Sequence, residues 1–407
     1  MAKKGFNTFT QMGKDWEQGI NFERLRRERL QRTREAMAHD GLGAIVVLRA
    51  ENIRYISGIR SQIQRPGRYS YYTVLPIEGD PVHFEIGGDL GRLKENAPWM
   101  EGRLFAAFPL GDNGPMIGEA AEAKTLDQWY EQIYKVLKEN GVANQKIGFD
   151  AVNFETINKL QKSGLKFVDG RKTMFDARVI KTRDELELCF ITATVADACF
   201  QKIKDVAQVG VKESEVWGEV VKTAFVLGAE NISGILTSGG RTNPYYRLMG
   251  SDKILGPGDL LISDVVMNIM GYWSCVVRTF LIGSKPATSE QKAAHRAAYE
   301  ALYNGINACK AGVTTDKVAA KFIQEGFETF SLNIGHGLGL SVQEEPVVHP
   351  TYSKEFPFKL KANMQLAFET FVATADGRQG VRLEEDFIVT EDGVEVITRY
   401  PFDERLM

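Results

Sequence analysis

An acid and a thiol, Asp264 and Cys275, lie eleven positions apart in a segment whose pattern predicts two strands and a turn. The apolar residues predict strands at Leu260 to Met267 and Tyr272 to Ile282, joined at Asn268 to Gly271. Cross-strand neighbours in a hairpin lie about 5 Å apart, so the two side chains can share one face as metal ligands. Such a site needs further ligands from elsewhere. The alternative is a core hairpin with an isolated acid and a buried thiol.

Three further residues of metal-ligand type follow in the chain. His336 lies in the sequence Gly-His-Gly-Leu-Gly, whose glycines allow close approach of backbone or ligand. Glu369 lies within an apolar strand sequence, and an unpaired buried carboxylate is costly, so it needs a cation or a metal. Period-two alternation places Glu384 on one strand face with Arg382 and Asp386. Each acid can instead pair with an arginine or face solvent, and the histidine can be structural.

The hypothesis of a metal site rests on the set rather than on any one member. Carboxylates, an imidazole and a thiolate together are typical of zinc or iron sites. The thiol has two other interpretations: a nucleophile of lowered pKa, for which the sequence places no partner histidine, and an inert small residue. The candidate metal ligands are Asp264, Cys275, His336, Glu369 and Glu384.

The composition is that of an ordinary globular protein, with 407 residues, of which 43% are hydrophobic and 25% charged. Two domains are the simplest number for this length. A net charge of −3 gives no electrostatic reason to expect binding to nucleic acid or to an anionic membrane. The four cysteines form no CxxC cluster, and no apolar run has the length of a signal peptide or a membrane span. We therefore expect a cytoplasmic protein without disulfides.

Alternation of strands and helices predicts an α/β N-terminal domain over residues 1–175. Its strands are predicted at 44–48, 71–75, 83–86, 146–150 and 166–168, and its helices at 22–38, 124–140 and 154–162. After a short linker near 172–180, outer helices and inner antiparallel hairpins predict an α+β domain over residues 176–407. Its helices are predicted from Thr182 or Asp184 to Val206 and at 213–226, 289–311 and 315–329, and its strands at 235–238, 260–282, 364–375 and 382–398.

Together these motifs resemble the pita-bread superfamily of creatinases, prolidases and Xaa-Pro aminopeptidases. The resemblance covers most of the chain, from the Asn52-Ile-Arg-Tyr-Ile-Ser-Gly motif through Ile180-Lys181 to the last acid. It implies a creatinase-like first domain and a pita-bread catalytic domain. The metallopeptidases of this family bind two metal ions through an Asp-Asp-His-Glu-Glu set. These positions fall, in order, on Asp264, Cys275, His336, Glu369 and Glu384.

Three departures from the family pattern weaken the expectation of a dinuclear peptidase. Tyr245 and Tyr246 stand where the peptidases carry a histidine after a Ser-Gly motif. Gln343 stands at the place of a second histidine. Cys275 replaces a bridging acid, and a thiolate offers a single ligand atom. We therefore expect one divalent metal ion (iron, zinc or manganese) or no metal at all, as in creatinase.

A narrower resemblance concerns the reaction. Arg241-Thr-Asn-Pro and Thr398-Arg-Tyr-Pro-Phe-Asp are similar to motifs of dimethylsulfoniopropionate lyases built on the same fold. Those enzymes use one iron and a carboxylate base for β-elimination. Val342 stands where simple alignment places that base, so Glu344 or Glu345 can substitute only if the loop shifts.

Three functions are compatible with these residues. The first is a hydrolase that cleaves a C–N bond of a small charged substrate, with Glu369 as general base and Tyr246 or Arg382 holding the developing anion. In a metal-free variant, His336 and the acids activate water. The second is a mononuclear-metal lyase in which Glu344 or its neighbour removes a proton. The third is a non-catalytic binding protein with a degraded site.

Substrate binding is assigned to Arg60, Arg65, Tyr245 and Gln343. In creatinase-like homodimers the first domain of one subunit covers the site of the other. The resemblance therefore implies that Arg60, Arg65 or Arg68 binds a substrate carboxylate bidentately, the alternative being a solvated loop. We expect a homodimer that acts on a small molecule and has no nucleic-acid or membrane partner.

Overall fold

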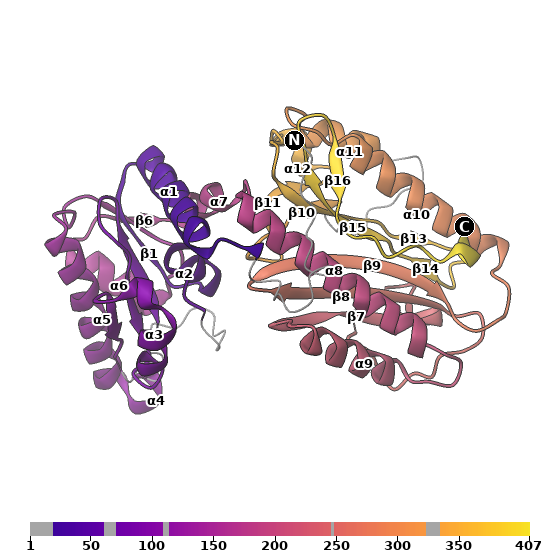
Figure 1. Cartoon of the computed structure of the whole chain (residues 1–407), viewed down its shortest axis with the longest axis horizontal. Coiled ribbons are helices and arrows are strands. Elements are labelled where there is room, and N and C mark those ends of the chain that lie inside the picture. The colour runs from indigo at the N-terminus through magenta and orange to yellow at the C-terminus, as the bar shows by residue number, and fades with distance from the viewer. Residues whose placement is uncertain (1–18, 61–70, 109–113, 246–247, 323–333) are drawn as a thin grey trace. The chain divides into compact units, whose positions relative to one another are not determined.

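The computed structural model describes residues 19–60, 71–108, 114–245, 248–322 and 334–407. The chain divides into two compact units, Met1–Arg178 and Val179–Met407, coloured indigo to magenta and magenta to yellow in Figure 1. Each unit has its own sheets and its own hydrophobic core. Among the residues described, no helix is long and apolar enough to cross a membrane.

The first unit is an α/β domain, as predicted, built on a mixed six-stranded sheet in the order β4-β3-β2-β1-β5-β6. The central strand β1 is Leu-Gly-Ala-Ile-Val-Val, and all six residues are buried, which is typical of a strand covered on both faces. The strands are β1 (Leu42–Val47), β2 (Tyr72–Pro76), β3 (Val82–Glu85), β4 (Leu104–Ala106), β5 (Lys146–Phe149) and β6 (Phe167–Asp169).

The first unit contains several helices that the sequence did not predict, and one of them lies in the expected linker. The segment expected to be a linker, 172–180, is largely the helix α7, which buries Met174 and Ala177 and packs against α1. Packing on a neighbouring helix stabilises a helix too short to be stable alone. The helices are α1 (Phe22–Asp40), α2 (Ala50–Ser57), α3 (Leu90–Asn96), η2 (Pro98–Met100), α4 (Gly114–Ile117), α5 (Glu119–Glu139), α6 (Phe154–Ser163) and α7 (Arg171–Arg178).

The second unit is the predicted α+β domain. It contains a three-stranded sheet, β7-β8-β9, a five-stranded sheet, β11-β10-β12-β15-β16, and the pair β13-β14. The strands are β7 (Asn231–Ser238), β8 (Leu260–Ile269), β9 (Tyr272–Leu281), β10 (Gly335–Gly337), β11 (Glu344–Val348), β12 (Gln365–Glu369), β13 (Val372–Ala373), β14 (Gly380–Val381), β15 (Glu384–Val389) and β16 (Val394–Val396).

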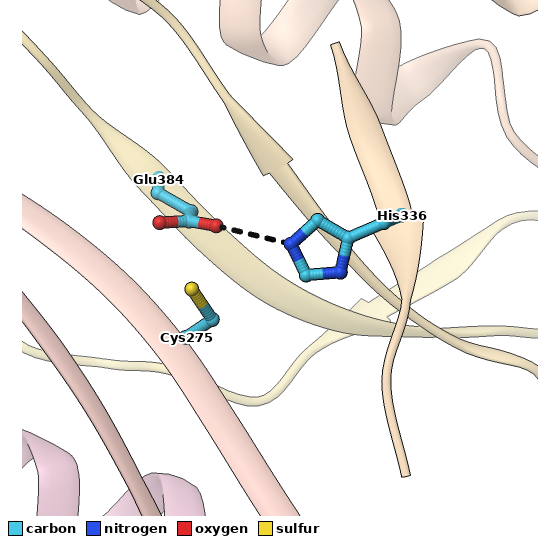
Figure 2. A group of neighbouring side chains, drawn as sticks. All are labelled: Cys275, His336 and Glu384. Atoms are coloured by element: carbon cyan, nitrogen blue, oxygen red, sulfur yellow. Dashed lines mark ion pairs between the residues drawn. The ribbon is translucent and has the colours of Figure 1, made fainter. Parts of the chain in front are cut away.

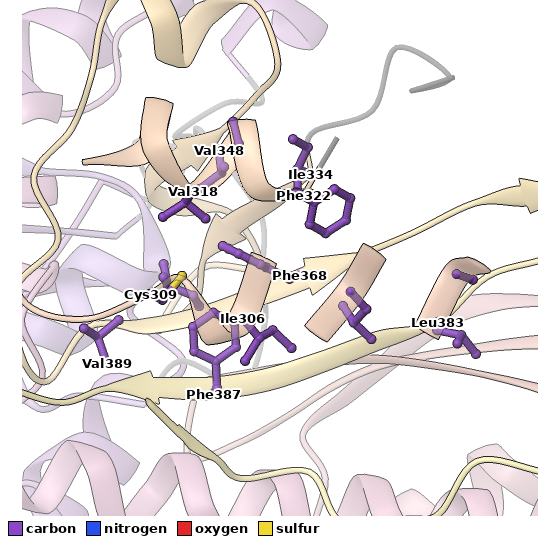
Figure 3. Close-up of a cluster of buried hydrophobic side chains, with 14 of the residues drawn as sticks. Ile306, Cys309, Val318, Phe322, Ile334, Val348, Phe368, Leu383, Phe387 and Val389 are labelled. Atoms are coloured by element: carbon purple, nitrogen blue, oxygen red, sulfur yellow. The ribbon is translucent and has the colours of Figure 1, made fainter. Parts of the chain in front are cut away.

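Helices cover the outer faces of these two sheets (Figure 1). α8 and α9 pack against the three-stranded sheet, and α10 and α11 pack against the five-stranded sheet. The second interface forms the largest core of the unit, in which the rings of Phe368 and Phe387 meet edge to face with centroids 4.9 Å apart (Figure 3). The helices are α8 (Arg183–Val206), α9 (Glu213–Val226), η4 (Gly239–Arg241), α10 (Ser289–Asn307), α11 (Thr315–Phe322), α12 (Tyr352–Glu355) and η5 (Glu404–Leu406).

The β8–β9 hairpin fixes the register of Asp264 and Cys275. Ile269 pairs with Tyr272, and the two residues between them have positive φ angles of 50° and 82°, the geometry of a tight two-residue turn. Val266 is then the direct partner of Cys275, and Asp264 lies two residues further along β8. Because side chains alternate between faces, Asp264 and Cys275 are diagonal neighbours on the same face.

Candidate metal centre

Three strands bring a thiol, an imidazole and a carboxylate together in the second unit. Cys275 comes from β9, His336 from β10 and Glu384 from β15, and Figure 2 shows the three side chains converging. One ligand atom from each lies within 4.8 Å of the other two, and all three residues are buried. The Nε2 atom of His336 lies 4.0 Å from Oε1 of Glu384. These distances leave room for a cation between the three groups.

The ring of His336 is oriented by its own strand. Its Nδ1 atom lies 3.0 Å from the carbonyl oxygen of Gly337, so Nδ1–H donates and the lone pair is on Nε2, which faces Glu384. Burial lowers the pKa of His336, which keeps the ring neutral. A neutral imidazole whose second nitrogen donates to a carbonyl is the form that binds metal ions.

No lysine or arginine in the described part of the chain forms an ion pair with the carboxylate of Glu384. Among the residues described, no nitrogen or hydroxyl group donates a hydrogen bond to either of its oxygens. Burial and the charge of Asp264 raise the pKa of Glu384 well above its ordinary value, and Arg382 only partly opposes this. An uncompensated buried carboxyl group costs stability unless a proton or a cation neutralises it.

Asp386 fixes the backbone of the strand segment that carries the Cys275 thiol. Asp386 accepts hydrogen bonds from the backbone N–H of Cys275 at 3.2 Å and from the hydroxyl of Ser274 at 2.6 Å. Burial, followed by the charges of Glu384 and Asp264, raises the pKa of the thiol well above its ordinary value. A nucleophilic cysteine needs a lowered pKa, so this environment does not support that role for Cys275.

The remaining two predicted ligands belong to a separate group around Arg382. This guanidinium donates to Oδ2 of Asp264 at 3.2 Å and to the hydroxyl of Tyr245 at 2.8 Å, and its other terminal nitrogen pairs with Glu369. Glu369 and Glu384 are nevertheless direct cross-strand partners in β12 and β15. The five predicted ligands therefore form a three-residue ligand group and a pair of carboxylates bound by one arginine.

Two family models match consecutive parts of the chain. Residues 29–180 match the creatinase/prolidase N-terminal domain, and residues 188–391 match metallopeptidase family M24. The chain belongs to metallopeptidase family M24. The resemblance stated from the motifs is thereby confirmed, and so is the assignment of an enzyme, a hydrolase or a lyase.

Relatives of this M24 chain include both classes of enzyme. A dimethylsulfoniopropionate lyase of Roseovarius nubinhibens is 24% identical over 403 residues, which cover 95% of this chain and 88% of the relative. A Xaa-Pro dipeptidase of Pyrococcus furiosus is 28% identical over 281 residues, which cover 66% of this chain and 77% of the relative.

Solved structures confirm the pita-bread fold of this M24 chain. A Xaa-Pro dipeptidase from Bacillus anthracis superposes with a TM-score of 0.75 at 24% identity, and the match covers 93% of this chain and 98% of that one. A prolidase from Pyrococcus horikoshii gives a TM-score of 0.74 at 22% identity, with 92% and 99% covered. Likeness at this level of identity establishes the fold.

The ligand group of this M24 chain fits a divalent cation by its chemistry. A thiol, a neutral imidazole and a carboxyl group without a protein cation are the donors of zinc and iron sites. Binding a cation would favour release of the thiol and carboxyl protons, because thiolate and carboxylate are the ligating forms. Three protein ligands leave a coordination position open, which is typical of catalytic sites.

The other predicted site residues lie in different surroundings. Glu344 is 4% exposed and forms an ion pair with Lys181 at 3.1 Å, whereas Gln343, just before it, is exposed. Arg60 is exposed and follows α2 in the first unit. Tyr246, Arg65 and Arg68 lie outside the described residues, so their proposed roles stay predictions.

Sequence reasoning assigned no role to two residues that support the site. Asp386 binds the backbone of Cys275, and the alternation that placed it on the face of Glu384 was a usable signal. Lys181 was noted only as part of a domain-boundary motif, although its partner Glu344 was a candidate base. The lysine and its acid are 163 positions apart, and no local pattern connects them.

Proposed function

We propose that this chain is a mononuclear metal-dependent hydrolase that cleaves a C–N bond in a small charged substrate. The observation that carries the proposal is the separation of Cys275, His336 and Glu384 from the group around Arg382. Within the described part of the chain, the first group has no protein cation and the second has Arg382, so one divalent ion suffices to neutralise the site. The thiol favours zinc or iron over manganese, because thiolate is a soft ligand.

When bound, the ion would act as a Lewis acid on the substrate and on water. The protein groups around it have separate tasks. Glu369 is the general base, because it is the cross-strand partner of Glu384 and is 8% exposed. Arg382 holds that carboxylate by an ion pair.

Tyr245 contributes to substrate binding through its position beside the guanidinium. Its hydroxyl accepts a hydrogen bond from Arg382 at 2.8 Å, and the guanidinium carbon lies 5.2 Å from the centre of its ring. Burial raises the pKa of this hydroxyl, so it stays protonated at neutral pH. A neutral phenol with one proton to donate suits a developing anion on the substrate.

Elimination is the second candidate, and one observation favours it. Two dimethylsulfoniopropionate lyases match this chain over 95% and 94% of its length. Of the two residues expected to act as base in that reaction, Glu344 and Glu345, the first is buried in an ion pair with Lys181. A lyase built on this chain would therefore use Glu345 or Glu369 to remove the proton.

Metal analysis and product analysis together test the proposal. The purified chain is reconstituted separately with zinc, iron(II), cobalt(II) and manganese, and the bound metal per chain is measured. The loaded forms are then assayed with Xaa-Pro dipeptides, guanidino compounds and sulfonium or ammonium betaines. We expect one ion per chain and release of an amine. Release of an alkene would support the lyase. Absence of metal binding would exclude both metal-dependent reactions and leave a metal-free hydrolase or a non-catalytic protein.

We also propose a homodimer in which Arg60 or Arg65 of one subunit binds a substrate carboxylate at the site of the other. Support comes from the family resemblance and from the exposure of Arg60. Mixing an Arg60→Ala, Arg65→Ala protein with a Glu369→Gln protein tests this. Two inactive parents should regain activity in the mixed dimer, and no recovery would contradict shared sites.

A further inference from the structure

A buried ion pair lies beside the ligand group without belonging to it. The Nζ atom of Lys181 lies 3.1 Å from Oε2 of Glu344, and each side chain is only 1% exposed. The lysine backbone is also fixed, since its N–H donates to the carbonyl of Asn363 at 2.9 Å. Burying two charges costs free energy that their attraction only partly recovers. Such a pair therefore contributes little to stability, but it can hold the segments that carry Lys181 and Glu344 in one relative position.

Glu344 connects this lysine to the turn between β10 and β11. Its other oxygen, Oε1, accepts a hydrogen bond from the backbone N–H of Ser341 at 3.1 Å. The turn leaves no room beside it, because a Cβ atom at Gly339 would come within 2.6 Å of Oε2 of Glu344. The Gly-x-Gly pattern after the histidine thus serves the close approach of this carboxylate to the backbone.

The same residue is also linked to the histidine. Glu344 is the cross-strand partner of Gly337, at a point where the register between β10 and β11 shifts. The carbonyl of Gly337 accepts the Nδ1 hydrogen bond of His336 at 3.0 Å. The position of Glu344 therefore sets the direction of the carbonyl that fixes the imidazole tautomer. The turn is also supported by β9, the strand that carries Cys275, because the N–H of Trp273 donates to the carbonyl of Gly339 at 2.8 Å.

We propose that Lys181 is a positioning residue for the metal centre, which acts through Glu344 and the Gly337 carbonyl to present Nε2 of His336 to the cation. Glu344 is then a support for the turn and takes no part in proton transfer. The proposal rests on the metal site of the proposed function. It assigns a task to the lysine at the start of the second unit and explains why a candidate base is buried.

Two variants test the proposal: Lys181→Met, which removes the charge at similar length, and Glu344→Gln, which keeps the shape and one acceptor. Loss of a group that orients a metal ligand costs about 10- to 100-fold in metal affinity. We expect this loss in a cobalt(II) titration followed by absorption of the thiolate–cobalt band. Val318→Ala, a truncation of a buried core residue on α11, is the control for general destabilisation.

The second readout does not require metal. Nitrogen-15 spectra of histidine in the metal-free protein report whether His336 carries its proton on Nδ1. We expect the Nδ1–H form in the wild type and in Val318→Ala, and a mixture of tautomers in Lys181→Met and Glu344→Gln. If Lys181→Met does not fold, Glu344→Gln decides on the same criteria.

The outcomes separate the two proposals. If the wild type binds no cobalt, the proposed function is wrong, and a tautomer unchanged by both variants would overturn the positioning role as well. If the wild type binds cobalt and both variants bind it as tightly as Val318→Ala, with the Nδ1–H form retained, the positioning role is wrong while the metal site stands.

Discussion

Glu369 and Glu384 are direct cross-strand partners, but their carboxylates have different neighbours. Glu369 is paired with Arg382, whereas Glu384 faces the thiol of Cys275 and the imidazole of His336. Like charges directly opposite one another in a sheet are destabilising. Arg382 neutralises the charge of Glu369, and a proton or a metal ion must neutralise the charge of Glu384. We therefore expect the single guanidinium of Arg382 to limit the number of cations that the site binds.

Replacing this arginine should change the number of metal ions bound. In Arg382→Met, Asp264 and Glu369 lose their cation and stay buried, so the metal-free protein should lose about 3–5 kcal/mol of unfolding free energy. The freed carboxylates offer a second cation site, so zinc per chain should rise from one toward two and restore part of the lost stability. Metal analysis and thermal unfolding with and without zinc check this.

The control is Arg378→Met, because the side chain of Arg378 is 84% exposed. A zinc content of Arg382→Met that stays at one ion per chain would contradict the prediction.

Removing the thiol should change which metal is preferred. Cys275→Ser replaces a soft ligand by a weak hard one, so affinity for zinc and cobalt should fall more than the roughly 10- to 100-fold typical of a supporting residue. The thiolate–cobalt absorption should disappear, while manganese affinity should change little. Cys199→Ala is the matched control, because that thiol is also buried but lies on α8 near the Val220 carbonyl. A cobalt spectrum that survives Cys275→Ser would show that sulfur is not a ligand.

Periodicity predicted much of the site, because its residues lie on strands with one buried face. The turn after Ile269 placed Asp264 and Cys275 on one face, and the alternation from Arg382 to Asp386 placed Glu384 on another. These patterns are local, and a one-residue error would have sent every side chain to the wrong side.

The pairings within the site could not be predicted, because they join residues that are distant in sequence. Which acids Arg382 binds depends on how the two sheets of the second unit approach each other. The burial of Glu344 depends on Lys181, which lies in a different element. α7 was interpreted as a linker for a similar reason, since its stability comes from packing on α1.

A buried histidine far from the ligand group should make the protein sensitive to acid. His295 on α10 is fully buried, packs edge-on against Phe402, and neither ring nitrogen has a hydrogen-bond partner among the residues described. Burial lowers the pKa of His295 to about 4, below its ordinary 6.5, while Asp403 opposes and Arg278 reinforces this change. The histidine of the unfolded chain therefore becomes protonated near pH 6.5, whereas His295 in the folded chain stays neutral down to about pH 4. The free energy of unfolding falls as the pH drops from 6.5 toward 4.

The variant His295→Leu should remove this part of the acid sensitivity. Between pH 7 and pH 4.5 the wild type should lose about 2–3 kcal/mol of unfolding free energy through this residue, and the variant should lose that much less. Urea unfolding at the two pH values measures the difference. His39→Leu, with a side chain 83% exposed, is the control. Equal acid sensitivity of His295→Leu and the wild type would show that other groups dominate.

Glu213, on the first turn of α9, should govern the order of the loop that carries Tyr245. It is fully buried, and its two oxygens accept hydrogen bonds from the hydroxyls of Ser238 at 2.7 Å and Ser251 at 2.6 Å, which lie at the two ends of that loop. Glu213→Ala leaves the buried hydroxyl of Ser238 and the partly buried hydroxyl of Ser251 without this acceptor, which should cost about 1–3 kcal/mol for the buried one. Amide hydrogen exchange between residues 238 and 251 should become faster than in Glu219→Ala, a control on the same helix with a side chain 43% exposed.

Because Tyr245 accepts a hydrogen bond from Arg382, the Glu213→Ala variant should raise the substrate KM more than it lowers kcat. Exchange that speeds up equally across the whole second unit would show a general loss of stability instead of a loosened loop.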